Sequence, residues 1–245
     1  MRISPRLWLV ASGQFGFQTT HRLDCNVYLL DGGGQYALID AGGGVEPERI
    51  VEEISRAGVG MEQICCLLLT HVHADHAAGA AYFHNRYGIP VVVSKEAAPW
   101  LATADPDRTS IGPAVEAGVY PQDFVFPPCP AGRTVSEGDI VPVGRIDLHV
   151  IDSPGHSRGH VCFWFEEGGK LHLFSGDSIF AGGKVVIQNI WDCSIPEYAA
   201  TAEKLHRLRI EALYPGHGPF LQQDAFGHVQ KAYDAFRRLD IPANL

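Results

Sequence analysis

The chain has 245 residues, of which 46% are hydrophobic and 19% are charged, and its formal net charge is -9. This composition is typical of a globular protein with a sizeable core and excludes a disordered chain. The acidic balance, with no run of Lys or Arg, argues against nucleic acid and anionic membranes as partners. The length predicts a single domain over 1–245.

The start of the chain, MRISPRLWLV, holds too short an apolar stretch for a secretory signal, and no later stretch is long enough to span a bilayer. We therefore expect a cytoplasmic protein. The cysteines follow no metal-binding or disulfide spacing and are expected to be small buried side chains in a reducing compartment. They are Cys25, Cys65, Cys66, Cys129, Cys162 and Cys193.

In the first half, short β-rich runs between Gly or Asp turns predict strands, and apolar residues at helical spacing predict helices. The predicted strands are 7–13, 25–32, 35–42, 64–70 and 89–94, and the predicted helices are 46–57 and 74–87. From 99 to 130 proline is frequent and periodicity is weak. A loop of that length suggests either a lid over a binding site or a surface insertion that packs its own aromatic residues.

The second half returns to strands and ends in helices. Strands are predicted over 139–144, 146–152, 160–167, 170–176, 184–190 and 211–214, and helices over 194–207 and 224–239. Ser194-Ile-Pro-Glu197 has the pattern of a capping box with proline in the first turn. Strands followed by helices, twice over, predict an α+β layered sandwich with the helices outside.

The polar stretch His71-Val-His73-Ala-Asp75-His76 directly follows the apolar run 64–70. On extended backbone His71 and His73 point the same way, so both can reach one metal ion. Asp75 and His76 fall where the chain turns into the next helix and can face a second ion. Neutral imidazole and carboxylate suit Zn²⁺ and its borderline neighbours.

Two metal ions need more donors than this stretch supplies, and further candidates follow other predicted strands. His156 stands in Ser-Pro-Gly-His, Asp177 in Ser-Gly-Asp, and His217 in Pro-Gly-His-Gly. Each lies on a glycine-containing turn directly after an apolar strand, so converging strand ends would bring them together. The remaining histidines, including His160, are expected to be ordinary surface or core residues.

The motifs H-x-H-x-D-H, PGH, SGD and PGHG, in this order, resemble the metallo-β-lactamase superfamily over about residues 7–220. The resemblance implies a four-layer αβ/βα sandwich of two antiparallel or mixed sheets with the site along one edge. It assigns one metal to His71, His73 and His156, the other to Asp75, His76 and His217, and a bridging role to Asp177. It also matches Asp40, in ALIDAG, to an aspartate that orients the site without binding metal.

Two divalent metal ions, expected to be zinc with iron or manganese as alternatives, lower the pKa of a shared water from near 15.7 to about 7. The resulting hydroxide would attack a carbonyl or phosphoryl centre. Because Asp75 is both a ligand and close to that water, it is expected to orient the hydroxide and pass a proton to the leaving group.

Differences between this chain and individual branches of the superfamily narrow the range of possible functions. Asp177 argues against β-lactamase activity, because the β-lactamases of this family place another residue type there. Glyoxalase II shares the ligand set, but its glutathione-binding pattern is absent and only 28 residues (245 minus 217) follow His217. In acyl-homoserine lactonases a tyrosine stands where this chain has Phe180.

The function expected is therefore a stand-alone dinuclear metallo-hydrolase of a small ester, lactone or thioester. Phe180 and Lys184 are candidate substrate-binding residues, with Lys184 pairing with an anionic group. The alternatives are a phosphodiester or phosphotriester hydrolase, a persulfide dioxygenase holding one iron through His71, His156 and Asp177, and a metal-binding member without turnover. A small molecule is the expected partner. A homodimer is expected only because dimers are common among soluble enzymes.

Overall fold

The structure is a computed structural model that describes residues 1–245. The chain divides into two compact units. The N-terminal unit consists of residues 1–135 and 142–146, and the C-terminal unit of residues 136–141 and 147–245. The single domain predicted over 1–245 stays a prediction.

The N-terminal unit is built on a seven-stranded sheet in the order β1-β2-β3-β4-β5-β6-β7. The first four strands pair antiparallel, and the pairs β4–β5, β5–β6 and β6–β7 are parallel, so the sheet is mixed. The strands are β1 Arg2–Ser4, β2 Leu7–Ala11, β3 Val27–Asp31, β4 Tyr36–Ile39, β5 Ile64–Leu68, β6 Val91–Ser94 and β7 Arg133–Val135. The short strands β1 and β7 were not predicted from the sequence, because three residues carry too little pattern.

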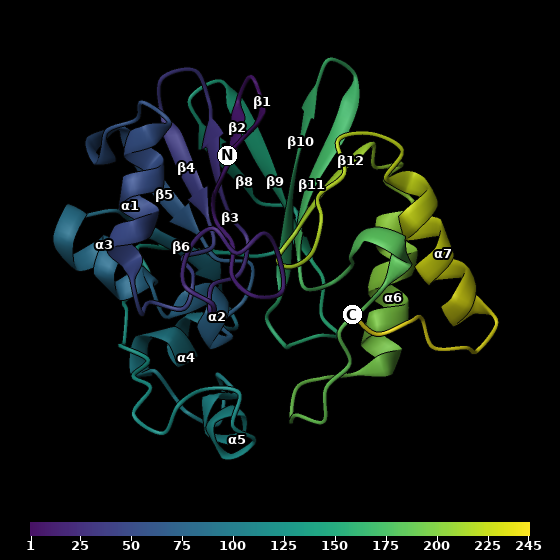
Figure 1. Cartoon of the computed structure of the whole chain (residues 1–245). Helices are drawn as coiled ribbons and strands as arrows, with labels where there is room; N and C mark the ends of the chain where they lie inside the picture. The colour runs from purple at the N-terminus through teal and green to yellow at the C-terminus, as the bar shows by residue number, and fades with distance from the viewer. The chain divides into compact units, whose positions relative to one another are not determined.

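Helices pack on this sheet through a continuous apolar core. α1 (Pro47–Arg56) contributes Ile50 and Ile54 to that core, and α3 (Ala80–Tyr87) contributes Phe83. A 3-10 turn, η1 (Met61–Gln63), leads into β5. Figure 1 shows α1 and α3 on the same side of the strands of this unit. The core therefore fixes the sheet whose strand ends carry the candidate ligands.

The helix predicted over 74–87 is two helices. α2 (Ala74–Ala77) is a single turn, and α3 begins after Gly79. A Cβ on Gly79 would lie 2.1 Å from the carbonyl oxygen of Ala41, and the Gly79 amide donates to the carbonyl of Gly42 at 3.1 Å. Glycine thus lets the chain after β4 approach the helix start, and this tertiary approach breaks the helix.

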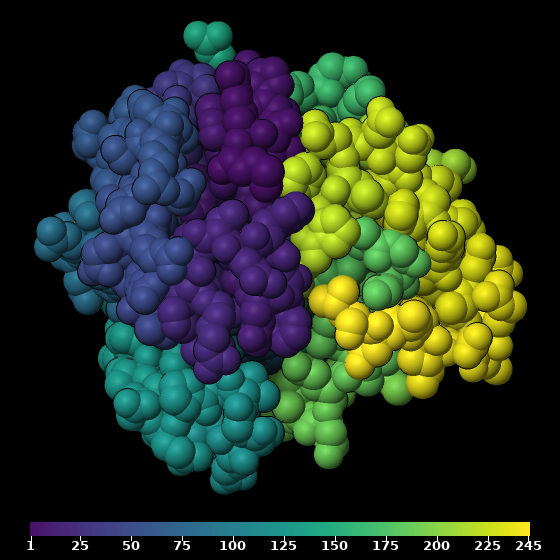
Figure 2. Space-filling view, in the orientation of Figure 1, coloured from purple at the N-terminus to yellow at the C-terminus, as the bar shows by residue number.

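The segment 99–130 is more ordered than its sequence predicted. It overlaps α4 (Ala98–Thr103) and contains α5 (Ile111–Glu116), and it lies on the surface of its unit in teal (Figure 2). Ile111, Tyr120 and Phe126 are buried, so the segment joins the core of the unit as well as packing its own aromatic residues. Its role as a lid stays a prediction.

The C-terminal unit carries most of a five-stranded sheet in the order β12-β11-β10-β9-β8. β10 is antiparallel to β9 and to β11, and β11 is parallel to β12, so this sheet is also mixed. The strands are β8 Ile140–Val143, β9 Ile146–Asp152, β10 Val161–Glu167, β11 Lys170–Gly176 and β12 Ala212–Pro215.

Two helices cover one face of this second sheet. α6 (Ile195–His206) and α7 (Phe226–Arg237) lie side by side in Figure 1, and their Leu205 and Val229 pack with Leu173 of β11. Ser194 caps α6 by accepting the amide of Glu197 at 3.4 Å, as the capping-box pattern predicts.

The strand predicted over 184–190 is wrong. That segment follows a short 3-10 turn, η2 (Ala181–Gly183), and forms only isolated bridges, of which one joins Val185 to Asn244. All six cysteines are free thiols, of which Cys25, Cys66, Cys129 and Cys162 are buried. No helix has the length and apolar character needed to cross a membrane.

Candidate metal centre

In the N-terminal unit, the candidate ligands follow neighbouring parallel strands. β4 ends at Ile39, directly before Asp40, and β5 ends at Leu68, shortly before His71. The amide of Asp40 donates to the carbonyl of Leu68 at 2.8 Å, so the ends of β4 and β5 are hydrogen-bonded to each other. Since carboxyl ends of parallel strands meet at one edge of a sheet, polar side chains collect there.

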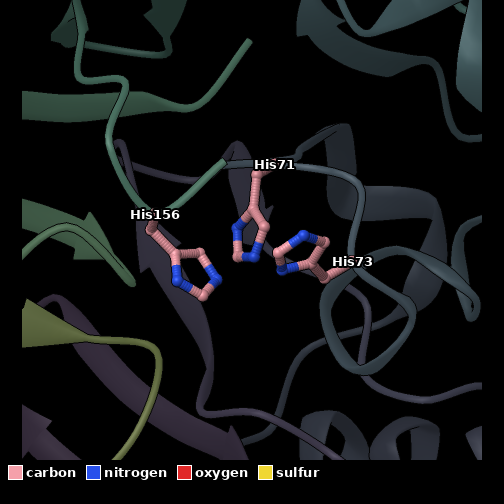
Figure 3. Close-up of side chains that lie close together, drawn as sticks. All are labelled: His71, His73 and His156. Carbon is pink, nitrogen blue, oxygen red and sulfur yellow. The ribbon is translucent and has the colours of Figure 1, made fainter. Parts of the chain in front are cut away.

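The H-x-H-x-D-H stretch folds back on itself at this edge. The ring centroids of His71 and His73 are 4.7 Å apart, and those of His71 and His76 are 4.1 Å apart. Figure 3 shows the rings of His71 and His73 turned toward each other from one loop. Asp75 Oδ2 lies 3.7 Å from His76 Nε2. One short stretch therefore gathers four donor side chains.

Asp40 holds this cluster in orientation. Its Oδ2 accepts a hydrogen bond from His76 Nδ1 at 2.8 Å, and its carboxylate also accepts from the Thr70 hydroxyl at 2.9 and 3.1 Å. The Thr70 hydroxyl lies 3.1 Å from His71 Nδ1 and, having given its proton to Asp40, accepts from that nitrogen. One buried carboxylate thus fixes the Nδ1–H tautomer of His71 and His76, which leaves each Nε2 lone pair for a metal ion.

Cys25 lies beside this network, with its sulfur within 4.8 Å of donor atoms of Asp40 and His76. Burial raises the pKa of the Cys25 thiol to about 12. A thiol must lose its proton to bind metal, and Asp40 Oδ2 is already hydrogen-bonded to His76 Nδ1. These three side chains therefore form a packed polar core beside the cluster, and they are not a metal site of their own.

In the C-terminal unit, three candidate ligands follow three strands that run in the same direction. β9 and β11 are both antiparallel to β10, and β12 is parallel to β11, so all three end at one edge. His156 follows β9, Asp177 follows β11 and His217 follows β12. The expectation that these strand ends converge holds within this unit.

Asp177 stands between the two histidines. Its Oδ2 lies 3.5 Å from His156 Nε2 and 3.4 Å from His217 Nε2. Both separations exceed the usual length of a hydrogen bond. Two donors bound at about 2.1 Å to one tetrahedral zinc ion lie about 3.4 Å apart. Each of these two separations is therefore that of a pair of donors bound to one metal ion.

The loop that carries His156 is fixed by glycine and by a carbonyl. Gly155 has a φ of +136°, and a Cβ there would lie 2.6 Å from the Tyr198 backbone in the first turn of α6. His156 Nδ1 lies 3.0 Å from the carbonyl oxygen of Val186, to which it must donate. With Nδ1 engaged in this way, His156, drawn in Figure 3, presents Nε2 as its candidate ligand atom.

Two residues that the sequence reasoning did not select hold the backbone of Asp177. His160 Nε2 accepts the Asp177 amide at 3.1 Å, while its Nδ1 lies 2.7 Å from the Ser153 hydroxyl. Tyr198 donates its hydroxyl to the Asp177 carbonyl at 2.8 Å. The expectation that His160 is an ordinary core residue is incomplete. Its spacing four residues after His156, on the far side of a turn, was the signal available.

The two candidate substrate residues also lie in the C-terminal unit. Phe180 is 1% exposed, and its ring centroid is 6.3 Å from that of His217 in a stacked arrangement. The Phe180 amide donates to the Lys184 carbonyl at 3.0 Å, which closes the turn between them. Phe180 therefore supports His217, and Lys184 is half-buried beside that turn.

Tyr120, from the segment 99–130, was also missed. Its hydroxyl donates to Asp75 Oδ1 at 3.2 Å, and its side chain is buried against Phe124, with ring centroids 4.6 Å apart. Burial, followed by the charge of Asp75, raises the pKa of the Tyr120 phenol well above its usual range. No pattern in the sequence linked this tyrosine to the H-x-H-x-D-H stretch.

Each unit therefore carries a partial set of metal donors. The N-terminal unit gathers His71, His73, Asp75 and His76, and the C-terminal unit gathers His156, Asp177 and His217. Buried imidazole nitrogens and carboxylate oxygens, with tautomers fixed by neighbouring acceptors, are the donor set of zinc and similar ions. The residues present fit the metal ions that the sequence motifs imply.

Comparison with known sequences identifies the family of this chain. The model of the metallo-beta-lactamase superfamily matches residues 22–217. A hydroxyacylglutathione hydrolase from Chelativorans sp. (strain BNC1) is 33% identical over 185 residues, which are 75% of this chain and 58% of that protein. The acyl-coenzyme A thioesterase MBLAC2 from Gallus gallus is 30% identical over 211 residues, with 78% of this chain and 72% of that protein covered.

Solved structures agree on the fold. A metallo-beta-lactamase from Cronobacter sakazakii superposes with a TM-score of 0.74 at 19% identity, over 98% of this chain and 93% of that chain. A metallo-beta-lactamase family protein from Thermus thermophilus gives a TM-score of 0.74 at 22% identity, over 96% and 80% of the two chains. The α+β fold with two mixed sheets and helices is thereby confirmed, and the chain belongs to the metallo-β-lactamase superfamily of metal-dependent hydrolases.

Proposed function

We propose that this chain is a hydrolase with a two-metal centre that cleaves small ester, lactone or thioester substrates, with thioesters favoured. The observation that carries the proposal is the position of Asp177 Oδ2, at 3.5 and 3.4 Å from the Nε2 atoms of two histidines. The resemblance stated above supplies the pairing of the two partial donor sets.

In this proposal, His71, His73 and His156 would hold one metal ion, and Asp75, His76 and His217 would hold the other. Asp177 would serve as a ligand to both. Divalent ions in such a centre, with zinc the expected metal, lower the pKa of a bound water and polarise the substrate carbonyl. Asp40 keeps the Nε2 atoms of His71 and His76 available through the hydrogen bonds at their Nδ1 atoms.

The substrate preference follows from the relatives. One is named a hydroxyacylglutathione hydrolase, one an acyl-coenzyme A thioesterase, and a third, from Aspergillus fumigatus, an atrochrysone carboxyl ACP thioesterase. All three names describe the hydrolysis of an acyl group carried on a thiol. We therefore extend a thioester preference to this chain.

Within the site, Asp75 is proposed to orient the attacking water and then to pass a proton to the leaving group. Lys184 is proposed to pair with an anionic part of the substrate, and Phe180 to keep His217 in place by stacking on it at 6.3 Å between ring centroids. We also propose a cytoplasmic location and a small-molecule partner, since six free thiols suit a reducing compartment.

The test is metal content measured together with turnover. Protein purified without added metal or chelator is expected to hold two zinc ions, or a mixture of zinc, manganese and iron, per chain. It is also expected to release thiol from short acyl-thioesters. Asp177→Ala should lower kcat/KM at least about 100-fold, because even the loss of a residue that only orients a ligand costs 10- to 100-fold.

The matched control is His149→Gln, since His149 lies in β9 and stacks on Trp164 at 4.2 Å, away from the strand ends that carry the ligands. It should keep both metal ions and turnover. One iron per chain, with oxygen uptake on persulfide substrates, would overturn the proposal in favour of a dioxygenase. Turnover of phosphodiesters or phosphotriesters without turnover of thioesters, lactones or esters would move the proposal to phosphorus centres.

A further inference from the structure

We infer that Tyr120 is a positioning residue for Asp75. The Tyr120 hydroxyl holds Asp75 Oδ1, so that Asp75 Oδ2 is turned to the metal position. Through this contact, Tyr120 couples the segment 99–130 to the metal centre. This inference rests on the proposed function, because it takes Asp75 as a metal ligand.

The two oxygens of Asp75 have different surroundings. Oδ1 accepts the Tyr120 hydroxyl at 3.2 Å, and Oδ2 lies on the side of His76, 3.7 Å from Nε2. A carboxylate can bind an ion through one oxygen or both. The hydrogen bond from Tyr120 orients the carboxylate so that Oδ2 lies on the side where His76 presents Nε2, its ligand atom.

The position of Tyr120 is fixed by packing as well as by this hydrogen bond. Tyr120 is 8% exposed, and its ring packs on Phe124, four residues later, at 4.6 Å between centroids. It follows α5 after Gly118, whose φ of +74° turns the chain. The hydroxyl is thus delivered to Asp75 by the fold of the segment, and a shift of the segment would move it away.

This contact gives the segment 99–130 a defined influence on the site. The Tyr120 hydroxyl donates its proton in the hydrogen bond to Asp75 Oδ1. While the segment is seated, Asp75 is held by Tyr120 on one side and by its backbone on the other, since its carbonyl accepts the Cys25 amide at 3.2 Å. When the segment is displaced, Asp75 keeps the backbone contact but loses the hydrogen bond from Tyr120 to its Oδ1.

The first variant is Tyr120→Phe, which keeps the ring, its burial and its packing on Phe124 and removes only the hydroxyl. Zinc affinity is measured by competition with a chromophoric chelator. The zinc ion assigned to Asp75 and His76 is expected to bind about 10-fold more weakly, because the loss of a group that orients a ligand costs 10- to 100-fold in affinity. The other zinc ion should be unaffected, so only one of the two affinities should change, and at saturating zinc kcat should fall more than KM rises.

Two further variants separate this role from a structural one. Phe124→Leu keeps the hydroxyl but loosens the packing of the segment, and Tyr82→Phe removes a hydroxyl from the partly buried aromatic group of α3. Phe124→Leu should speed amide hydrogen exchange over 111–126 and weaken binding of the zinc ion assigned to Asp75 by less than Tyr120→Phe does, because the hydroxyl is kept but held less firmly. Tyr82→Phe should change neither.

Amide exchange in metal-free protein tests the contact without metal binding or turnover. Tyr120→Phe should speed exchange at 74–78 and at 117–126. Unchanged exchange at both segments would overturn the inference and leave the proposed function standing. The same holds if the wild-type protein binds two zinc ions and Tyr120→Phe changes neither affinity. A wild-type protein that binds fewer than two metal ions would contradict the proposed function, and the exchange data would still decide whether Tyr120 holds Asp75.

Discussion

Replacing Asp40 by asparagine should reverse the tautomer of His76. Asp40 Oδ2 accepts the proton of His76 Nδ1 at 2.8 Å, and Oδ1 accepts the amide of Thr70 at 2.8 Å. In Asp40→Asn one of these oxygens becomes an NH₂ group, which can only donate. With the amide oxygen facing Thr70, the NH₂ faces His76 and requires Nδ1 to accept, so the ring proton moves to Nε2.

The alternative orientation of the amide does not remove the conflict. Rotated by 180°, the asparagine side chain presents its oxygen to His76 and its NH₂ group to the Thr70 amide. Two donors then face each other. The position is buried, since Asp40 is 1% exposed. A buried donor left without an acceptor costs about 1–3 kcal/mol. Restoring the ligand tautomer of His76 therefore costs about that much, and a tenfold change in affinity corresponds to about 1.4 kcal/mol.

We expect Asp40→Asn to weaken binding of the zinc ion assigned to His76 by about 10- to 100-fold, which agrees with the usual effect of removing a partner of a ligating histidine. Chelator competition gives the affinity, and ¹⁵N NMR of the imidazole nitrogens in metal-free protein shows which one carries the proton.

Asp24→Asn is the matched control. Asp24 is 4% exposed in the same unit, and its carboxylate accepts the backbone amides of His21 and Gly43 at 3.0 and 2.8 Å. It should cost stability without changing zinc affinity. Equal loss of affinity in both variants would refute the tautomer argument, and so would an Asp40→Asn protein that keeps the Nδ1–H form of His76.

Three further outcomes follow from the structure. His160→Gln should lower kcat about 10- to 100-fold with little change in KM in steady-state assays, because His160 Nε2 accepts the Asp177 amide and glutamine cannot reproduce both of its hydrogen bonds. Gly155→Ala should lower the free energy of unfolding in urea by about 3 kcal/mol, since its φ is +136° and its Cβ would lie 2.6 Å from Tyr198, whereas Gly168→Ala, with a φ of +60° and open space, should cost about 1 kcal/mol. Burial lowers the pKa of His172 below its ordinary value of 6.5, so the unfolded chain binds more protons there and stability should rise with pH up to the ordinary pKa. His172→Gln should reduce that slope when urea unfolding is compared at about pH 5 and pH 8.

The sequence predicted elements whose pattern is local. The runs that became β5 and β10 are long enough and apolar enough to be recognised, and Ser194 with Glu197 marked the start of α6. The failures have tertiary causes. Gly79 breaks the helix over 74–87 because the chain at Ala41 approaches it, and α5 forms in a proline-rich segment because Ile111 and Tyr120 reach the core.

The candidate ligands were predictable for a different reason. Each follows a strand end and stands in a short motif, so residue type and position together carry the signal. The residues that orient them have no such signature. Thr70, Tyr120 and His160 act through contacts with partners 30, 45 and 17 residues away, at Asp40, Asp75 and Asp177. Such contacts depend on which strands are neighbours, and the sequence pattern of single elements does not specify that.

Asp40 has to meet two requirements, one on its backbone conformation and one on its side chain. Its φ is +64°, in the left-handed region that a side chain with a Cβ rarely adopts, directly after β4. A glycine would adopt this conformation without strain, but only a carboxylate can accept from Thr70 and from His76 together. Aspartate is among the few residues with a side chain that tolerate this backbone. The strain at this position is therefore retained because the adjacent histidines need an acceptor, and we expect Asp40→Gly to keep the turn while the zinc affinity falls as it does in Asp40→Asn.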